Sequence, residues 1–146
     1  MNDPFNLQRF MDAQTPVFDA VRKELRRGCK QGHWMWFILP QLKGLGYSSM
    51  AQKFGISSQA EAKEYLAHPV LGPRITECVR LTIAVDGRSA EDIFGDIDAM
   101  KFRSSMTLFA QVAGDDSVFA DALRKYFGGQ PDQQTLERLK SESPSQ

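Results

Sequence analysis

The sequence has few of the residues from which metal sites and disulfide frameworks are built. It contains two cysteines, Cys29 and Cys78, and two histidines, His33 and His68. No Cys-x-x-Cys or His-x-x-x-His pair is present, whereas zinc ligands usually cluster at such spacings. We therefore expect free thiols and no metal site.

An excess of one charge and a long apolar run are also missing. The 18 Lys and Arg balance the 18 Asp and Glu, which argues against general nucleic-acid binding. The longest fully apolar run, residues 34–39, is far shorter than the ~20 residues that span a bilayer. The polar N-terminus lacks a signal-peptide pattern. We expect a cytoplasmic protein with no membrane association.

The motifs of common cofactor and hydrolase folds are absent as well. There is no Gly-x-x-x-x-Gly-Lys phosphate loop and no Gly-x-Ser-x-Gly nucleophile elbow. Gly44-Leu45-Gly46 is too short for a dinucleotide fingerprint. No cofactor is therefore predicted, and composition alone names no activity.

Helix start and stop signals, by contrast, occur along the whole chain. Apolar residues recur at steps of three and four, between capping residues and stop signals such as Gly28. Ser58 and Glu61 form a capping-box pattern. No strict alternation of apolar and polar residues appears, so we predict an all-α fold with seven or eight short helices. Residues 1–140 would form one compact domain, and residues 141–146 a disordered polar tail.

Two segments are ambiguous at this level. The run Trp34–Leu39 fits either a buried strand or a short helical segment. Ser89–Asp92 is interpreted as a cap on a turn that ends at Gly95.

The richest cluster of unusual side chains lies between Lys30 and Gln41. Both tryptophans, Trp34 and Trp36, fall here beside His33. Indole and imidazole rings can stack on a flat base, and Gln41 could read its edge. The alternative is that both tryptophans are core anchors, because helical winding would splay them about 200° apart.

A second cluster follows at residues 96–107. Asp98, Lys101 and Ser105 share one helical stripe, and Ser104 and Ser105 interrupt an apolar region. Such hydroxyls either bind a ligand or let helices approach closely. The other interpretation of Asp98 and Lys101 is a helix cap with a weak surface ion pair.

A third feature is a basic helix face that could receive a phosphate or a nucleic-acid backbone. A solvated face near a helix C-terminus is the other interpretation. Its residues are Arg22, Lys23, Arg26, Arg27 and Lys30.

Several longer motifs resemble a bacterial family of unknown function that is often mislabelled calpastatin. They are His-Trp-Met-Trp-Phe-x-x-Pro-Gln at 33–41, Phe-Gly-Ile-Ser-Ser at 54–58, Tyr-Leu-x-His-Pro-Val-Leu-Gly-Pro-Arg at 65–74, Ile-Phe-Gly at 93–95 and Lys-x-Arg-Ser-Ser-Met-Thr-Leu-Phe at 101–109. The resemblance covers residues 3 to about 139 and implies a mainly helical, stand-alone cytoplasmic domain. It implies no activity, and nothing in the chain supports protease inhibition.

A shorter likeness points to the helical N-glycosidases that act on ADP-ribose and riboflavin intermediates. It is carried by Leu71-Gly72-Pro73-Arg74 and by Lys101-Phe102. The N-terminal glutamate motif of those enzymes has no clean counterpart here.

Two hypotheses follow. In the first, the protein binds a nucleotide-like or ADP-ribose-like small molecule, with N-glycoside hydrolysis as its reaction. Asp98 or Glu24 would act as acid or base. The ligand-binding residues would be His33, Trp34, Trp36, Gln41, Arg74, Lys101, Ser104 and Ser105.

In the second hypothesis the protein is a non-enzymatic protein-interaction module whose motif residues are structural. Burial separates the two. A module would pack Trp34, Trp36, His33 and Ser105 away from water with no pocket, whereas an enzyme would leave a concave opening lined by them. The sequence leaves the substrate and the oligomeric state open.

Overall fold

The computed structural model describes residues 3–141, and within them the chain forms ten α-helices and no β-strand. An isolated parallel bridge between Leu42 and Ile56 is the one strand-like pairing in this range. The helices are α1 (Gln8–Gln14), α2 (Phe18–Arg27), α3 (Met35–Ile38), α4 (Ser49–Phe54), α5 (Gln59–Ala67), α6 (Leu71–Ile83), α7 (Ala90–Phe94), α8 (Asp96–Ala113), α9 (Val118–Phe127) and α10 (Gln133–Ser141).

Local sequence signals set many of the helix ends. Gly28 and Gly128 end α2 and α9 in the left-handed region, with φ of 70° and 61°, where a side chain would be strained. Four helices begin after a serine whose hydroxyl accepts a hydrogen bond from the N–H three residues later, which satisfies a donor that the helix itself leaves unpaired. These serines are Ser48, Ser58, Ser89 and Ser117.

The all-α prediction is confirmed, but the predicted number of helices is wrong. The two additional helices are α3 and α7, which have four and five residues. Neither spans two helical turns, so no apolar period can repeat within its sequence. The ambiguous run 34–39 contains α3, and the expected turn after Ser89 is the helix α7. Of the predicted tail, Ser141 belongs to α10, and residues 142–146 lie outside the described residues.

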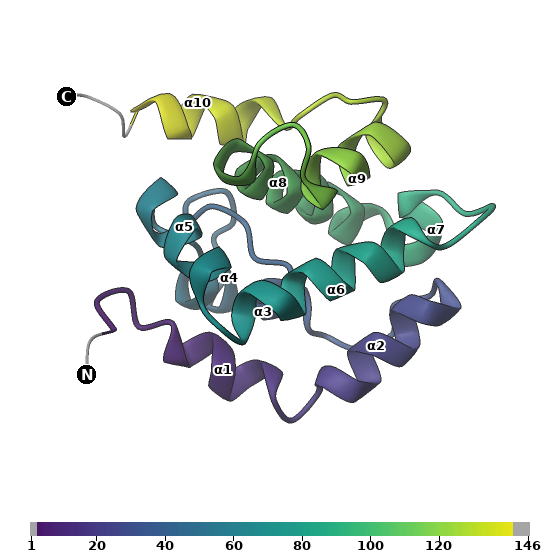
Figure 1. Ribbon diagram of the computed structural model, residues 1–146, viewed down its shortest axis with the longest axis horizontal. Helices are drawn as coiled ribbons and strands as arrows, with labels where there is room; N and C mark the ends of the chain where they lie inside the picture. Colours follow the sequence, from purple (N-terminus) through teal and green to yellow (C-terminus); the bar gives the residue numbers. More distant parts are fainter. Residues whose placement is uncertain (1–2, 142–146) are drawn as a thin grey trace.

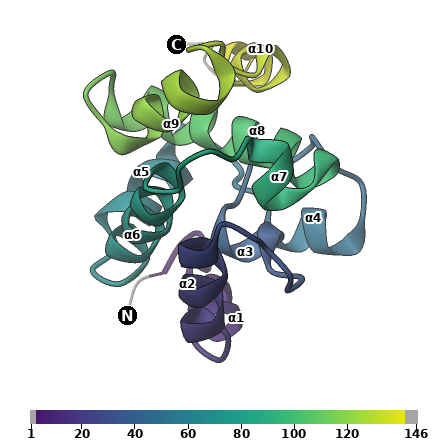
Figure 2. The ribbon, with the colours of Figure 1, turned by 90° about the vertical axis from the view of Figure 1, so that its right-hand side faces the viewer.

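The long helix α8 lies at the centre of the molecule (Figures 1 and 2). In both views α9 and α10 cover it on one side, while α1 and α2 lie at the opposite end. Phe102, Met106 and Phe109 of α8 are fully buried. The two phenylalanine rings contact rings of neighbouring helices, for example Phe109 with Tyr65 of α5 at 5.4 Å and with Phe119 of α9 at 5.5 Å between centroids. Helix α8 is therefore the element around which the core is built.

None of the helices within residues 3–141 has the length and apolar character needed to cross a membrane.

Candidate functional site

Two lysines and one carboxylate connect the loop after α2 to the start of α8. The ammonium of Lys30 lies 2.8 Å from Oδ2 of Asp98 and donates to the carbonyl of Gly32. Lys101, one helical turn after Asp98, places its Nζ 3.8 Å from Oδ1. Lys30 is nearly buried, with 8% of its side chain exposed, whereas Lys101 is 25% exposed. Lys30 is therefore the closer partner of Asp98, and Lys101 is the more exposed and more distant of the two cations.

Glu24 of α2 anchors the loop that carries Lys30. Its Oε1 accepts hydrogen bonds from the backbone N–H groups of Gln31 and Gly32 and from the indole N–H of Trp34. Burial alone would raise the pKa of Glu24, but these hydrogen bonds and the nearby Lys30 ammonium hold it below the ordinary 4.5. Glu24 is thus an ionised carboxylate whose Oε1 already has three donors.

The two tryptophans have different environments. Trp34 is 3% exposed, with Lys30 Nζ 5.0 Å from its ring centroid and its indole N–H on Glu24. Trp36 is half-buried, and Lys101 Nζ lies 4.9 Å from its ring centroid. The indole N–H of Trp36 is buried and has no hydrogen-bond partner among residues 3–141. A buried donor without a partner is unfavourable.

A small cleft lies beside Trp36. Its void is about 10 Å³, space for about one water molecule. Gln41 and Lys101 supply its polar side, and the Gln41 amide makes no hydrogen bond to the described residues. A ligand of ordinary size would therefore have to displace Lys101 or Gln41. The lining residues are Met35, Trp36, Leu39, Gln41, Ala51, Phe54, Gly55 and Lys101.

The two serines of α8 also differ. Ser104 donates to the carbonyl of Met100 one turn earlier, which is a satisfied helical arrangement. Ser105 is fully buried, and its hydroxyl has no partner within residues 3–141. It lies one turn beyond Lys101 on the predicted stripe.

Other predicted residues lie elsewhere. His33 is exposed and does not line the cleft. Arg74 of α6 contacts Gln14 and Thr15, each at 3.4 Å, and lies over the ring of Phe18. Lys30 therefore connects Glu24, Trp34 and Asp98. Lys101 connects Asp98 with Trp36 and Gln41. His33 and Arg74 belong to neither group.

The predicted basic face needs one correction. Helix α2 ends at Arg27, and the left-handed Gly28 redirects the chain. Lys30 therefore leaves the helix face and turns inward to Asp98. Only Arg22, Lys23, Arg26 and Arg27 lie on α2, and Arg22 is paired with Glu77 of α6 at 3.3 Å.

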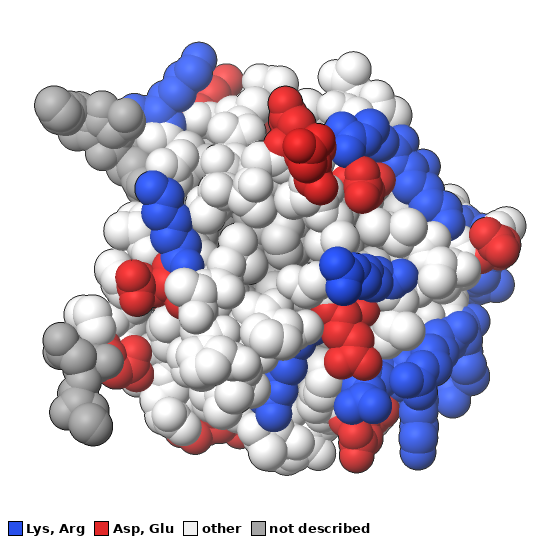
Figure 3. All heavy atoms as spheres, in the orientation of Figure 1, with Lys and Arg blue, Asp and Glu red and all other residues white. Residues whose placement is uncertain are grey.

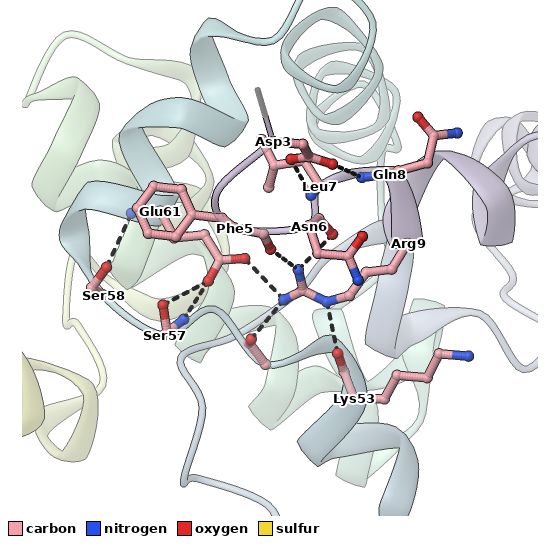
Figure 4. A network of polar contacts seen from close by, with 11 residues as sticks. Asp3, Phe5, Asn6, Leu7, Gln8, Arg9, Lys53, Ser57, Ser58 and Glu61 are labelled. Atoms are coloured by element: carbon pink, nitrogen blue, oxygen red, sulfur yellow. Dashed lines mark hydrogen bonds and ion pairs between the residues drawn. The ribbon is translucent and has the colours of Figure 1, made fainter. Parts of the chain in front are cut away.

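Sequence reasoning placed Lys30 on the basic helix face and did not foresee its contact with Asp98, and it missed Arg9. The Arg9 guanidinium donates to the carbonyls of Phe5, Asn6, Lys53 and Gly55 and to the carboxylate of the buried Glu61 (Figure 4). These acceptors take up the donors of the guanidinium, so Arg9 ties α1 to α4 and α5 and offers little to a ligand. No pattern within α1 indicates this role, because four of these partners are main-chain oxygens.

Comparison with known proteins places the chain in a family. The model of a protein family of unknown function, DUF1810, matches residues 4–139. The chain belongs to this family. A solved structure, that of the conserved hypothetical protein Rv1873 from Mycobacterium tuberculosis, is similar with a TM-score of 0.93 and 52% sequence identity. The match covers 94% of this chain and 99% of that one. No curated protein matches.

These matches support an uncharacterised helical family, as the motifs indicated. They lend no support to the calpastatin label or to the likeness to N-glycosidases. Among residues 3–141, no three His, Cys, Asp or Glu side chains are grouped so that they could hold a metal ion.

Proposed function

We propose that the cleft beside Trp36 binds a small anionic molecule that carries a planar ring, of the nucleotide or ADP-ribose type. The observation that carries this proposal is the position of Lys101, which lies 4.9 Å from the Trp36 ring centroid while only loosely paired with Asp98 at 3.8 Å. Lys30 already neutralises Asp98 through its 2.8 Å contact. Lys101 is thus the one surplus cation of this trio, and it sits beside an aromatic face.

The chemistry of the lining fits such a ligand. A phosphate or carboxylate would pair with Lys101, and a ring displacing Lys101 would stack on Trp36. The buried indole N–H of Trp36 and the free amide of Gln41 are hydrogen-bonding groups that a ligand could satisfy. The small void means that the ligand takes the space now filled by the Lys101 side chain.

If the ligand is an N-glycoside, Asp98 is the better placed of the two predicted carboxylates for acid–base work. Its side chain is 21% exposed and adjoins Lys101, whereas the Oε1 of Glu24 is occupied by three donors. Lys30 would then be a positioning residue that fixes Asp98. Asp98→Asn should abolish turnover while it leaves ligand binding within a few fold.

A thermal-shift screen tests the binding proposal. The panel contains nucleotides, ADP-ribose, nicotinamide dinucleotides and flavin precursors. A ligand at ~100 times its dissociation constant adds ~2.7 kcal/mol to stability and raises the melting temperature by several degrees. The shift should vanish in Lys101→Gln and Trp36→Leu. It should persist in Lys43→Gln, an exposed lysine that does not line the cleft.

The second candidate, a protein-interaction module, is favoured by one observation. Ile97 and Met100, which flank Asp98 and Lys101 at the start of α8, are 72% and 71% exposed. A flat screen, together with loss of a partner in Ile97→Ser/Met100→Ser, would support the module in place of the ligand site.

A further inference from the structure

A second, much larger groove lies away from the Trp36 cleft and shares no lining residue with it. It forms where α6 passes the end of α5 and the corner between α8 and α9, and its volume is about 660 Å³. That volume falls within the range of small-molecule sites. Most of the exposed wall is apolar, and it is lined by Leu66, Gly72, Pro73, Thr76, Glu77, Arg80, Leu81, Ala113 and Phe119.

Small residues create this groove. A Cβ at Gly72 would lie 2.1 Å from the carbonyl oxygen of Leu66, so only glycine lets α6 approach the end of α5 here. On the opposite wall, α8 ends at Ala113, and Gly114, with φ of 101°, turns the chain toward α9. No large side chain enters from either position, and Leu81 and Phe119 form the apolar walls.

The charges at the rim are unequal. The carboxylate of Glu77 is partly neutralised by an ion pair with Arg22, at 3.3 Å between Oε2 and Nε, and its side chain is 40% exposed. The guanidinium of Arg80 makes no hydrogen bond or ion pair with any residue in 3–141. In the view of Figure 3, uncharged atoms cover the middle of this face, and basic side chains gather toward the right, over α2 and α9, with acidic side chains among them. The groove therefore presents an apolar wall and one unpaired cation.

We propose that this groove binds a single-chain amphiphilic anion, an apolar chain that ends in a carboxylate or a similar group. The chain would lie against Leu81 and Phe119, and the anionic head would pair with Arg80. Along α6 the lining runs from Gly72 to Leu81, about 13 Å of helix. This length suits an extended chain of roughly ten carbon atoms, since a zigzag chain advances about 1.3 Å for each C–C bond of about 1.5 Å. The site is independent of the Trp36 cleft.

Decanoate titration, followed in ¹H–¹⁵N spectra below the micelle concentration, tests this assignment. Saturable shifts should be confined to the groove-lining residues of α6, α8 and α9. Decyltrimethylammonium, with a chain of equal length and the opposite charge, should bind at least about fivefold more weakly, the effect of one partly exposed charge pair.

Two variants separate the apolar wall from the charge. Ala113→Phe fills the groove from an exposed position and should abolish binding. Arg80→Gln should weaken decanoate about fivefold and should not weaken decyltrimethylammonium, which loses a like charge nearby. Arg27→Gln, an exposed arginine outside the groove, is the matched control and should leave both affinities unchanged.

The proposal is overturned if decanoate shows no saturable binding, or if Ala113→Phe binds it as tightly as the unaltered protein. Equal binding of the two amphiphiles, or an equal loss in Arg27→Gln and Arg80→Gln, would also overturn it, because Arg80 would then not recognise the head group.

Discussion

At the scale of single residues, Glu24 shows how one buried carboxylate organises a loop. Three N–H donors converge on one of its oxygens, and the pKa of Glu24 is lowered as a result. A carboxyl whose pKa is lowered by folding stabilises the native state when it is ionised. This stabilisation is present above its unfolded pKa and is lost as the pH falls through the folded value.

Glu24→Gln should therefore lower the free energy of unfolding by about 1–3 kcal/mol near neutral pH, since an amide replaces a charged acceptor. The difference from the unaltered protein should shrink as the pH falls below the ordinary pKa of a glutamate and Glu24 itself takes up a proton. Urea unfolding at several pH values measures this. Glu64→Gln, an exposed glutamate on α5, is the control and should follow the unaltered protein throughout. A constant deficit for Glu24→Gln at all pH values would contradict this account.

The two cysteines should differ in reactivity. Cys78 is fully buried in α6, and burial raises the pKa of its thiol to about 12, which suppresses the reactive thiolate. Cys29 is partly exposed. A thiol reagent should therefore label one cysteine in the native protein and both after denaturation. Cys29→Ser should leave no native labelling, and fast labelling of that variant would show that Cys78 is accessible.

At the scale of helices, His68 joins two elements. It follows α5, and its Nδ1 accepts hydrogen bonds from the backbone N–H groups of Val70 and Leu71 at the start of α6. These donors have no partner inside the helix.

His68→Ala should lower the free energy of unfolding by about 1 kcal/mol, the usual effect of a lost helix cap. His68→Asn supplies another side-chain acceptor and should recover most of it. Chemical denaturation of the unaltered protein and the two variants distinguishes a capping role of His68 from a packing role. Equal losses in both variants would mean that His68 acts through packing and not through its ring nitrogen.

Some local sequence patterns predict the helix ends correctly, and others are overridden by tertiary contacts. Gly28 ends α2 as its sequence predicts, because its left-handed φ is a local requirement. The capping-box pattern at Ser58 is only half formed, since Glu61 turns instead to Ser57 and Arg9. The reciprocal box forms at Ser89 and Asp92. Partners that are distant in sequence, such as Arg9, are invisible to local pattern rules.

At the scale of the whole molecule, the Arg9–Glu61 pair fastens the N-terminal segment to the rest of the fold. Arg9 is 14% exposed and Glu61 2%, with 2.9 Å between Nη2 and Oε2. Removal of Arg9 leaves the buried Glu61 carboxylate without a counter-ion, with hydrogen bonds from Ser57 remaining. Arg9→Met should therefore lower the free energy of unfolding by about 3–5 kcal/mol.

Calorimetry or urea unfolding measures this loss. Arg9→Met combined with Glu61→Leu should be less destabilised than the sum of the two single variants. Additive losses would mean that the two side chains do not depend on each other.

The candidate site was predictable in its residue types and less so in its geometry. The concentration of Trp, Gln and Lys pointed to residues 30–41 and 96–107, and Lys101, Trp36 and Gln41 do line one cleft. The inward turn of Lys30 depends on the left-handed Gly28 and on Asp98, far away in the chain. The exposure of His33 and the position of Arg74 beside α1 likewise arise from helix packing, which no local pattern contains.

The most direct test of the central claim follows the two indole N–H signals in a ¹H–¹⁵N spectrum, assigned with Trp34→Phe and Trp36→Phe. The N–H of Trp34 is held by Glu24, whereas that of Trp36 has no partner among the described residues. A ligand from the thermal-shift panel should move the Trp36 signal at saturation and leave the Trp34 signal nearly unchanged. Stabilising ligands that leave the Trp36 signal in place would contradict the account, as would a panel in which no compound moves it.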